Sequence, residues 1–208
     1  MDALPLLSIG FDRIGKRHGR QWVLRNVEGH VPAGGSLALL GANGSGKSSL
    51  LRLLCGFDAV SEGDIHWTVG QTAASRDDLF GTLSYCAPDQ SLILDLTVAE
   101  HIAFHQSNRI LLEGLDVDSV LRLALLQNKG EVRVRDLSSG MRQRLALALA
   151  FASRSCAVFL DEPTSHLDEQ GRQWYTRLLA EWRKGRTLVV ASNHNVAEFP
   201  SDSALLTL

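Results

Sequence analysis

Eight residues in the first quarter of the chain have the types and spacing of a phosphate-binding loop. Gly41 to Ser48 match the pattern G-x-x-x-x-G-K-S in full. Glycines there allow a tight turn whose backbone N–H groups converge on phosphate oxygens. We expect Lys47 to reach the β- and γ-phosphates and the Ser48 hydroxyl to ligate Mg²⁺. An apolar strand over 36–40 and a helix over 48–54 supply the strand–loop–helix context, with positive charge at the helix N-terminus. The predicted nucleotide contacts in this loop are Gly41, Ala42, Asn43, Gly44, Ser45, Gly46, Lys47, Ser48 and Ser49.

A pair of acids forms the second chemical element. Asp161 and Glu162 follow the apolar run 157–160, which is typical of a buried parallel strand. Open α/β sheets bind ligands at the C-terminal ends of such strands. We expect Asp161 to hold Mg²⁺, directly or through water, and Glu162 to polarise the attacking water as general base. Two acids before Pro163 also fit a solvated turn, but the phosphate loop in the same chain favours the catalytic interpretation.

A third segment lies between the loop and the acids. Residues 137–144 read L-S-S-G-M-R-Q-R and precede an apolar stretch. With this segment the whole chain resembles the nucleotide-binding subunit of ATP-binding cassette (ABC) transporters, whose signature is usually written LSGGQ. Ser138 and Gly140 keep that pattern, whereas Ser139 and Met141 stand where Gly and Gln are commoner.

The resemblance implies the fold class. It is α/β, with the parallel sheet core of a P-loop NTPase (RecA-like), an N-terminal antiparallel β subdomain and a helical insert subdomain at about 90–136. The expected organisation is a single ABC ATPase domain over 1–208. We predict parallel strands at 37–40, 83–86, 158–160, 188–191 and 204–206, and an antiparallel sheet over about 6–31 and 63–69, with turns at Gly15, Gly19 and Gly63.

The insert contains sequence signals that predict two helices. Thr97 and Glu100 have the spacing of a capping box, and a second helix is predicted from about Asp118 to Gln127. His101 and His105 have a spacing that can share a metal, but no further ligand is evident, which favours two surface or groove histidines. The predicted buried face of the second helix is Val120, Leu121, Ala124 and Leu125. Apolar residues expected in a groove for a membrane partner, or in the core, are Leu92, Ile93, Leu94 and Phe104.

The family resemblance implies a site shared by two chains. The phosphate loop of one copy and Ser138, Ser139, Gly140 and Met141 of the other enclose each ATP, with the helix after the signature directing its N-terminus at the anion. Ser138 also fits a simple helix N-cap. Asp168 resembles the D-loop acid, which senses the opposite site, and fits an N-cap equally well.

Three other positions depart from the family pattern. The Q-loop glutamine position holds Pro88, so Gln90, two residues later, is the candidate metal contact. The switch histidine position holds Asn193, with His194 one residue beyond, and both remain catalytic candidates. His18 stands where the family places an adenine-stacking ring, although Trp22 is close by.

The composition of the chain bears on which partners it can bind and on where in the cell it is found. The 208 residues carry a net charge of −2, which gives no general attraction to nucleic acid. The longest strongly apolar run, 145–152, is far shorter than the roughly 20 residues that a bilayer span needs, and no secretory signal is recognisable. The three scattered cysteines read as reduced buried thiols. We therefore expect a cytoplasmic protein, peripheral on the inner face of the cell membrane.

The predicted function is binding and hydrolysis of ATP, with Mg²⁺, to drive transport of an unknown substrate. The expected partners are a second copy of the ATPase and a transmembrane permease subunit. Two alternatives stay open: a regulatory or scaffold ABC protein with little or no hydrolysis, and a soluble ABC ATPase outside transport. Nothing in the chain encodes the cargo or the direction of transport.

Overall fold

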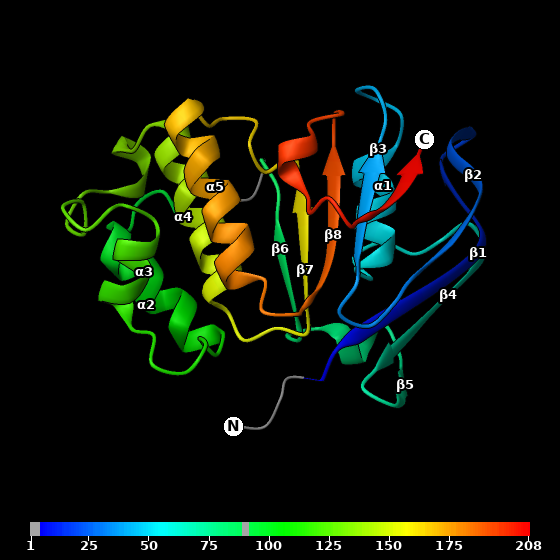
Figure 1. Ribbon diagram of the computed structural model, residues 1–208, viewed down its shortest axis with the longest axis horizontal. Helices are drawn as coiled ribbons and strands as arrows, with labels where there is room; N and C mark the ends of the chain where they lie inside the picture. The colour runs from blue at the N-terminus through cyan, green and yellow to red at the C-terminus, as the bar shows by residue number, and fades with distance from the viewer. Residues whose placement is uncertain (1–4, 89–91) are drawn as a thin grey trace.

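A five-stranded parallel sheet forms the centre of the molecule (Figure 1). The computed structural model describes residues 5–88 and 92–208. The order of the strands is β6-β7-β8-β3-β9, so strands distant in sequence are neighbours. All four pairings in this sheet are parallel, as expected of an α/β fold. The strands are β3 (Ser36–Leu40), β6 (Leu83–Cys86), β7 (Ala157–Asp161), β8 (Thr187–Ser192) and β9 (Ala204–Thr207).

A four-stranded antiparallel sheet lies beside it, on the right in Figure 1. Its order is β2-β1-β4-β5, from β1 (Leu7–His18), β2 (Gln21–Val31), β4 (Glu62–Val69) and β5 (Thr72–Ala74). The turn at Gly19 is confirmed. Turns at Gly15 and Gly63 are wrong, because both residues lie inside strands at an irregularity between β1 and β4. Gly63 adopts a φ of 78°, and a Cβ there would lie 2.5 Å from the Arg13 carbonyl oxygen. The pattern did not predict β5.

Helices cover the sheet and form the insert. On the left in Figure 1, α4 and α5 lie between the parallel strands and the insert helices α2 and α3. The bounds are α1 (Lys47–Leu54), α2 (Val98–Asn108), α3 (Val117–Leu123), α4 (Ser139–Ala152) and α5 (Glu169–Trp182), with 3₁₀ turns η1 (Asp77–Leu79), η2 (Val134–Asp136) and η3 (Val196–Glu198). Within the described parts of the chain, none of these helices combines the length and apolar character of a bilayer crossing.

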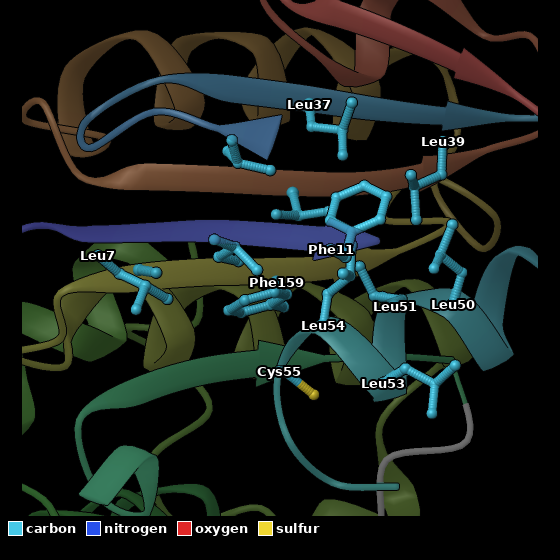
Figure 2. Packing of buried hydrophobic residues seen from close by; sticks show 14 of the residues in the cluster. Leu7, Phe11, Leu37, Leu39, Leu50, Leu51, Leu53, Leu54, Cys55 and Phe159 are labelled. Atoms are coloured by element: carbon cyan, nitrogen blue, oxygen red, sulfur yellow. The ribbon is translucent and has the colours of Figure 1, made fainter. Parts of the chain in front are cut away.

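Alternating residues of the parallel strands pack on opposite faces of the sheet. Phe159 joins a core with Leu50, Leu51 and Leu54 of α1 and with apolar residues of β1, as Figure 2 shows. Val158 and Leu160 of the same strand instead pack with α4 and α5. The helix behind the phosphate loop and the helix behind the signature therefore lie on opposite faces of the sheet.

The insert is partly as predicted. Thr97 and Glu100 form both hydrogen bonds of the capping box at the start of α2. The second helix ends at Leu123 and not near 127, because Leu125 adopts a φ of 56°, which a right-handed helix cannot contain. Leu125 is exposed, so its predicted burial is wrong; Leu126 takes the buried place.

One arginine lies wholly inside the protein. Arg186 is 1% exposed and donates to main-chain oxygens of Phe151 and Ser153 at the end of α4 and of Trp182 at the end of α5. No acidic side chain pairs with it among the described residues. Burial lowers the pKa of its guanidinium to about 10. The negative ends of two helix dipoles thus balance this charge.

Candidate nucleotide site

The phosphate loop joins β3 to α1 with the backbone geometry that its glycines permit. Gly44 and Gly46 adopt φ values of 82° and 100°, in the left-handed region. A Cβ on Gly46 would lie 2.7 Å from Leu24 Cδ2 of the antiparallel sheet. The loop is therefore seated against β2, and this position requires a residue without a side chain.

Lys47 connects the loop to the acidic end of β7. Its side chain is 4% exposed, and its Nζ donates to the carbonyl oxygens of Gly41 at 2.9 Å and Ala42 at 3.0 Å. The same Nζ lies 4.0 Å from Glu162 Oε1. Two segments separated by more than 110 residues therefore meet at one ammonium group.

The acids lie where the sequence placed them, at the C-terminal end of β7. Asp161 is the last strand residue and is buried. Glu162 follows with a φ of 42°, and its N–H donates to the Ala191 carbonyl oxygen on β8 at 2.9 Å. A left-handed backbone at a non-glycine residue costs about 1–3 kcal/mol and persists only where its surroundings hold it. Glu162 is thus held in a specific geometry.

The donor set fits Mg²⁺ bound together with phosphate oxygens. Ser48, at the start of α1, offers a hydroxyl and Asp161 a carboxylate, both oxygen ligands. The described residues contain no group of three or more His, Cys, Asp or Glu that forms a cage of its own. Mg²⁺ usually keeps several waters and binds through one or two protein ligands plus substrate phosphates. Ser45 Oγ in the loop is buried without a hydrogen-bond partner among the described residues, as expected beside a polar ligand.

The switch candidates follow β8. Asn193 and His194 are both exposed, and His194 adopts a φ of 59°. Neither side chain makes a hydrogen bond within the described part of the chain, so neither is preferred as the switch. Pro88 lies in the loop after β6, whereas Gln90 falls outside the described residues.

Sequence reasoning missed two residues of the same loop. Asn195 and Glu198 both hydrogen bond to Thr164, two residues after Glu162. The signal that the sequence offered was an acid, Glu198, four residues after His194. Its burial, which sets it apart from an ordinary surface acid, becomes visible only in the structure.

The signature and the D-loop meet through their backbones. Ser138 is the N-cap of α4, and its Oγ accepts a hydrogen bond from the Met141 N–H at 3.2 Å. A Cβ on Gly140 would lie 2.9 Å from the His166 carbonyl oxygen. Asp168 Oδ1 accepts from the Gly171 N–H at 2.8 Å, so the predicted capping roles of Ser138 and Asp168 are confirmed. Ser138 accepts as a cap, which leaves its hydroxyl proton available to an anion.

The two candidate rings near the N-terminus, Trp22 and His18, differ in their surroundings. The centroid of the Trp22 ring lies 5.7 Å from Arg17 Cζ and 5.2 Å from Arg25 Cζ, so two guanidinium groups contact this ring. A Cβ on Gly15 would also lie 2.9 Å from the Trp22 ring. His18 ends β1 and is exposed, whereas Trp22 is half-buried.

A groove of about 450 Å³ lies between the core and the insert. Exposed Phe80 and Phe104 line it, together with Arg76 and Arg109, and its described lining contains no Asp or Glu. Arg76 and Arg109 donate to main-chain carbonyl oxygens and have no carboxylate partner among the described residues. Of the apolar residues that the sequence suggested for this groove, Leu92, Ile93 and Phe104 line it, and Leu92 also packs against the core. Leu94 is exposed but is not among the described lining residues.

The two insert histidines also line this groove. His101 is buried, and its Nδ1 has no hydrogen-bond partner among the described residues. His105 Nε2 lies 2.8 Å from Ser153 Oγ, which itself donates to the Leu149 carbonyl oxygen. Because that hydroxyl proton is used, His105 must donate from Nε2, and burial lowers the pKa of its imidazole to about 4. These are groove histidines, as the sequence interpretation favoured.

The comparisons with known proteins agree with this geometry. The family model described as "ABC transporter" matches residues 24–165. The chain belongs to the ABC transporter family. Membership confirms the expected family, and the two sheets and helices described above are the expected fold class.

Among the relatives are import and export proteins. The chain is 36% identical to the sulfate/thiosulfate import ATP-binding protein CysA of Mesostigma viride, over 80% of this chain and 49% of that protein. It is 33% identical to the Nod factor export ATP-binding protein I of Rhizobium meliloti (strain 1021), over 92% of this chain and 58% of that protein. The chain thus spans about half the length of these relatives.

A solved structure confirms the fold. The ATP-binding cassette MJ0796, a dimer in a post-hydrolysis state bound to ADP and Pi, superposes with a TM-score of 0.73 at 23% identity. The match covers 90% of this chain and 88% of that one. At this identity the likeness establishes architecture, namely the two sheets and the helices described above.

Proposed function

We propose that residues 1–208 act as one ATPase domain that powers a membrane transporter. The observation that carries this proposal is the meeting of Lys47 with Glu162 across a complete phosphate loop. A loop lysine close to the acid after β7 places a phosphate-binding cation beside a group able to orient water. Glycine-lined backbone and the N-terminus of α1 supply the remaining electrostatic stabilisation.

In the proposed mechanism the chain supplies position and charge. The Lys47 ammonium turns from its two carbonyl contacts to the β- and γ-phosphates. Ser48 and Asp161 would hold Mg²⁺, which would supply positive charge beside the phosphate oxygens. Glu162 accepts a hydrogen bond from the attacking water and orients it in line with the γ-phosphorus. Asn193 or His194 lies on the adjacent strand end, where a side chain can contact the γ-phosphate. Gln90 remains the candidate for the Q-loop contact.

We further propose that two copies enclose the nucleotides. Ser138, Ser139, Gly140 and Met141 lie at the start of α4, on the face of the sheet opposite α1. A second chain can therefore bring its α4 N-terminus and the Ser138 hydroxyl to the phosphates. Asp168 lies next to this surface, and His18 is the proposed adenine contact. The dimeric state of MJ0796 supports the arrangement.

The groove is the proposed contact for a transmembrane permease subunit. Its exposed phenylalanines suit an apolar face of an inserted segment, and Arg76 with Arg109 suit an acidic residue on that segment. Such a partner would place the ATPase in the cytoplasm, on the inner face of the membrane. The test is co-purification in mild detergent: a captured integral membrane protein supports the proposal, and Arg109→Glu should weaken the capture at least about fivefold. Capture that is unchanged by Arg109→Glu would move the contact elsewhere.

Glu162→Gln tests the catalytic assignment. The substitution keeps the shape of the side chain but removes its basicity, so we expect ATP turnover to fall at least about 100-fold. ATP affinity should stay within about threefold, because Lys47 and the loop are unchanged. Glu181→Gln, the same change at an exposed acid of α5, is the matched control. Turnover by Glu162→Gln at the wild-type rate would show that Glu162 is not the base. A wild-type protein that binds ATP without turnover would favour the scaffold alternative, which Pro88 in the Q-loop suggests.

A further inference from the structure

A buried carboxylate joins the two loops that carry the catalytic candidates. Glu198, at the end of η3, is 4% exposed. Its Oε1 accepts hydrogen bonds from both polar groups of Thr164, the N–H at 3.1 Å and the hydroxyl at 2.5 Å. Thr164 belongs to the turn after β7, and Glu198 to the loop after β8. One oxygen atom thus fixes one loop against the other.

A second residue of the β8 loop completes this connection. Asn195 Nδ2 donates to Thr164 Oγ1 at 3.1 Å. Since the single hydroxyl proton of Thr164 goes to Glu198, its oxygen is left to accept from Asn195. Asn195 directly follows Asn193 and His194. The bonded set therefore links the switch candidates to the turn that begins at Glu162.

The same turn is also held from the signature side. Gln143, on the second turn of α4, is 4% exposed, and its Nε2 donates to the Pro163 carbonyl oxygen at 3.0 Å. The turn at Pro163 and Thr164 thus lies between the signature helix and η3. Glu162 has the left-handed backbone described above, and such a conformation depends on its neighbours.

Packing alone does not explain an acid at position 198. Burying a carboxylate costs several kcal/mol unless it is paired and hydrogen bonded. Within the described residues no lysine, arginine or histidine forms an ion pair with Glu198. An apolar side chain would fill the space at less cost but could not accept two hydrogen bonds from Thr164. We therefore attribute the acid at this position to the geometry that its two hydrogen bonds impose on Thr164.

We propose that Glu198 is a positioning residue for ATP hydrolysis, acting through Thr164 to hold Glu162 and the switch loop in one fixed arrangement. It does not contact the nucleotide. The inference rests on the proposed hydrolysis by this chain and adds a residue to that reaction. Its consequence is a change in kcat without a matching change in nucleotide affinity.

Three variants test the proposal kinetically. In Glu198→Ala the turn loses its acceptor, and we expect kcat to fall about 10- to 100-fold, the effect of a misplacement of about 1 Å, with KM for ATP within about twofold. Glu198→Gln keeps one carbonyl oxygen that can accept both bonds and should restore most of kcat. Thr164→Val removes only the hydroxyl and should also lower kcat. In the double variant, Glu198→Ala should cause little further decrease in kcat, because both changes break the same contact.

Tyr175→Phe is the matched control. The Tyr175 hydroxyl donates to the main-chain oxygen of Glu198 at 2.7 Å, so its loss loosens the same residue without touching Thr164. We expect a lower melting temperature and unchanged kcat. If Tyr175→Phe and Glu198→Ala lower kcat equally for an equal loss of stability, Glu198 is merely structural and the proposal fails. Wild-type kcat in a folded Glu198→Ala protein would also overturn it.

A readout without turnover separates this proposal from the proposed function. Hydrogen exchange of the Thr164 amide should accelerate in Glu198→Ala and stay protected in Glu198→Gln and Tyr175→Phe. If Glu198→Ala does not fold, Thr164→Val compared with Thr164→Ser supplies the kinetic comparison. Unchanged exchange at Thr164 in a folded Glu198→Ala protein would contradict the positioning role, whether or not the wild type hydrolyses ATP.

Discussion

Replacing Arg186 by methionine should destabilise the protein strongly, although the site contains no acid to pair with. Methionine has a similar length and no donors. The change leaves the carbonyl oxygens of Phe151, Ser153 and Trp182 without their donor inside the core. At about 2 kcal/mol for each unsatisfied group, the loss is about 6 kcal/mol.

Part of this loss is returned because a charge is no longer buried. The pKa of the Arg186 guanidinium is lowered from 12.5 to about 10, which corresponds to about 3 kcal/mol against the charged form. The net expectation for Arg186→Met is a decrease of about 3 kcal/mol in the free energy of unfolding. For a chain of this size each kcal/mol lowers Tm by about 2–4 °C.

The assay is urea unfolding followed by circular dichroism, without nucleotide. Arg177→Met, the same change at an exposed arginine of α5, is the control and should stay within about 0.5 kcal/mol of wild type. If Arg186→Met is as stable as Arg177→Met, the guanidinium does not satisfy the ends of α4 and α5, and the reasoning is refuted.

Two more predictions follow from single positions. Gly46→Ala forces a Cβ to within 2.7 Å of Leu24 Cδ2 at a φ of 100°, so ATP affinity should fall at least about tenfold by fluorescence titration. Gly185→Ala, at a φ of 74° with open space around its Cβ, should bind ATP normally, and equal binding by both variants would contradict the steric argument. For His105 the folded pKa of about 4 lies below the unfolded value of about 6.5, so protonation favours the unfolded state and stability should fall as the pH drops from 6.5 to 4. In urea melts this fall in the free energy of unfolding should reach about 2 kcal/mol at pH 5. The fall should be smaller in His105→Gln than in His30→Gln, the same change at an exposed histidine. An equal fall in the two variants would refute the role of His105.

The elements of the candidate nucleotide site were predictable because their sequence signals are local. The phosphate loop, the strand before it and the acids after β7 each depend on residues adjacent in sequence. Their meeting at the Lys47 ammonium follows from strand order, since β7 and β3 are separated only by β8 in the sheet. The fold class and the parallel strands were confirmed for this reason.

What escaped prediction depends on contacts between distant segments. The bulge at Gly63 arises from its approach to the Arg13 carbonyl group across β1 and β4. Glu198 reads as an ordinary surface acid until β8 brings it beside Thr164, 34 residues away in sequence. Arg186 likewise reads as exposed, and only the packing of two helix ends makes its burial favourable.

The proposed completion of each nucleotide site by a second copy of the chain can be tested by the molar mass of Glu162→Gln. We would measure it by light scattering with saturating ATP and Mg²⁺. We expect a dimer with ATP and a monomer without it. Adding Ser139→Arg, which places bulk at the exposed signature but keeps the Ser138 cap, should abolish the dimer. A monomer at saturating ATP, or a dimer that tolerates Ser139→Arg, would contradict the account.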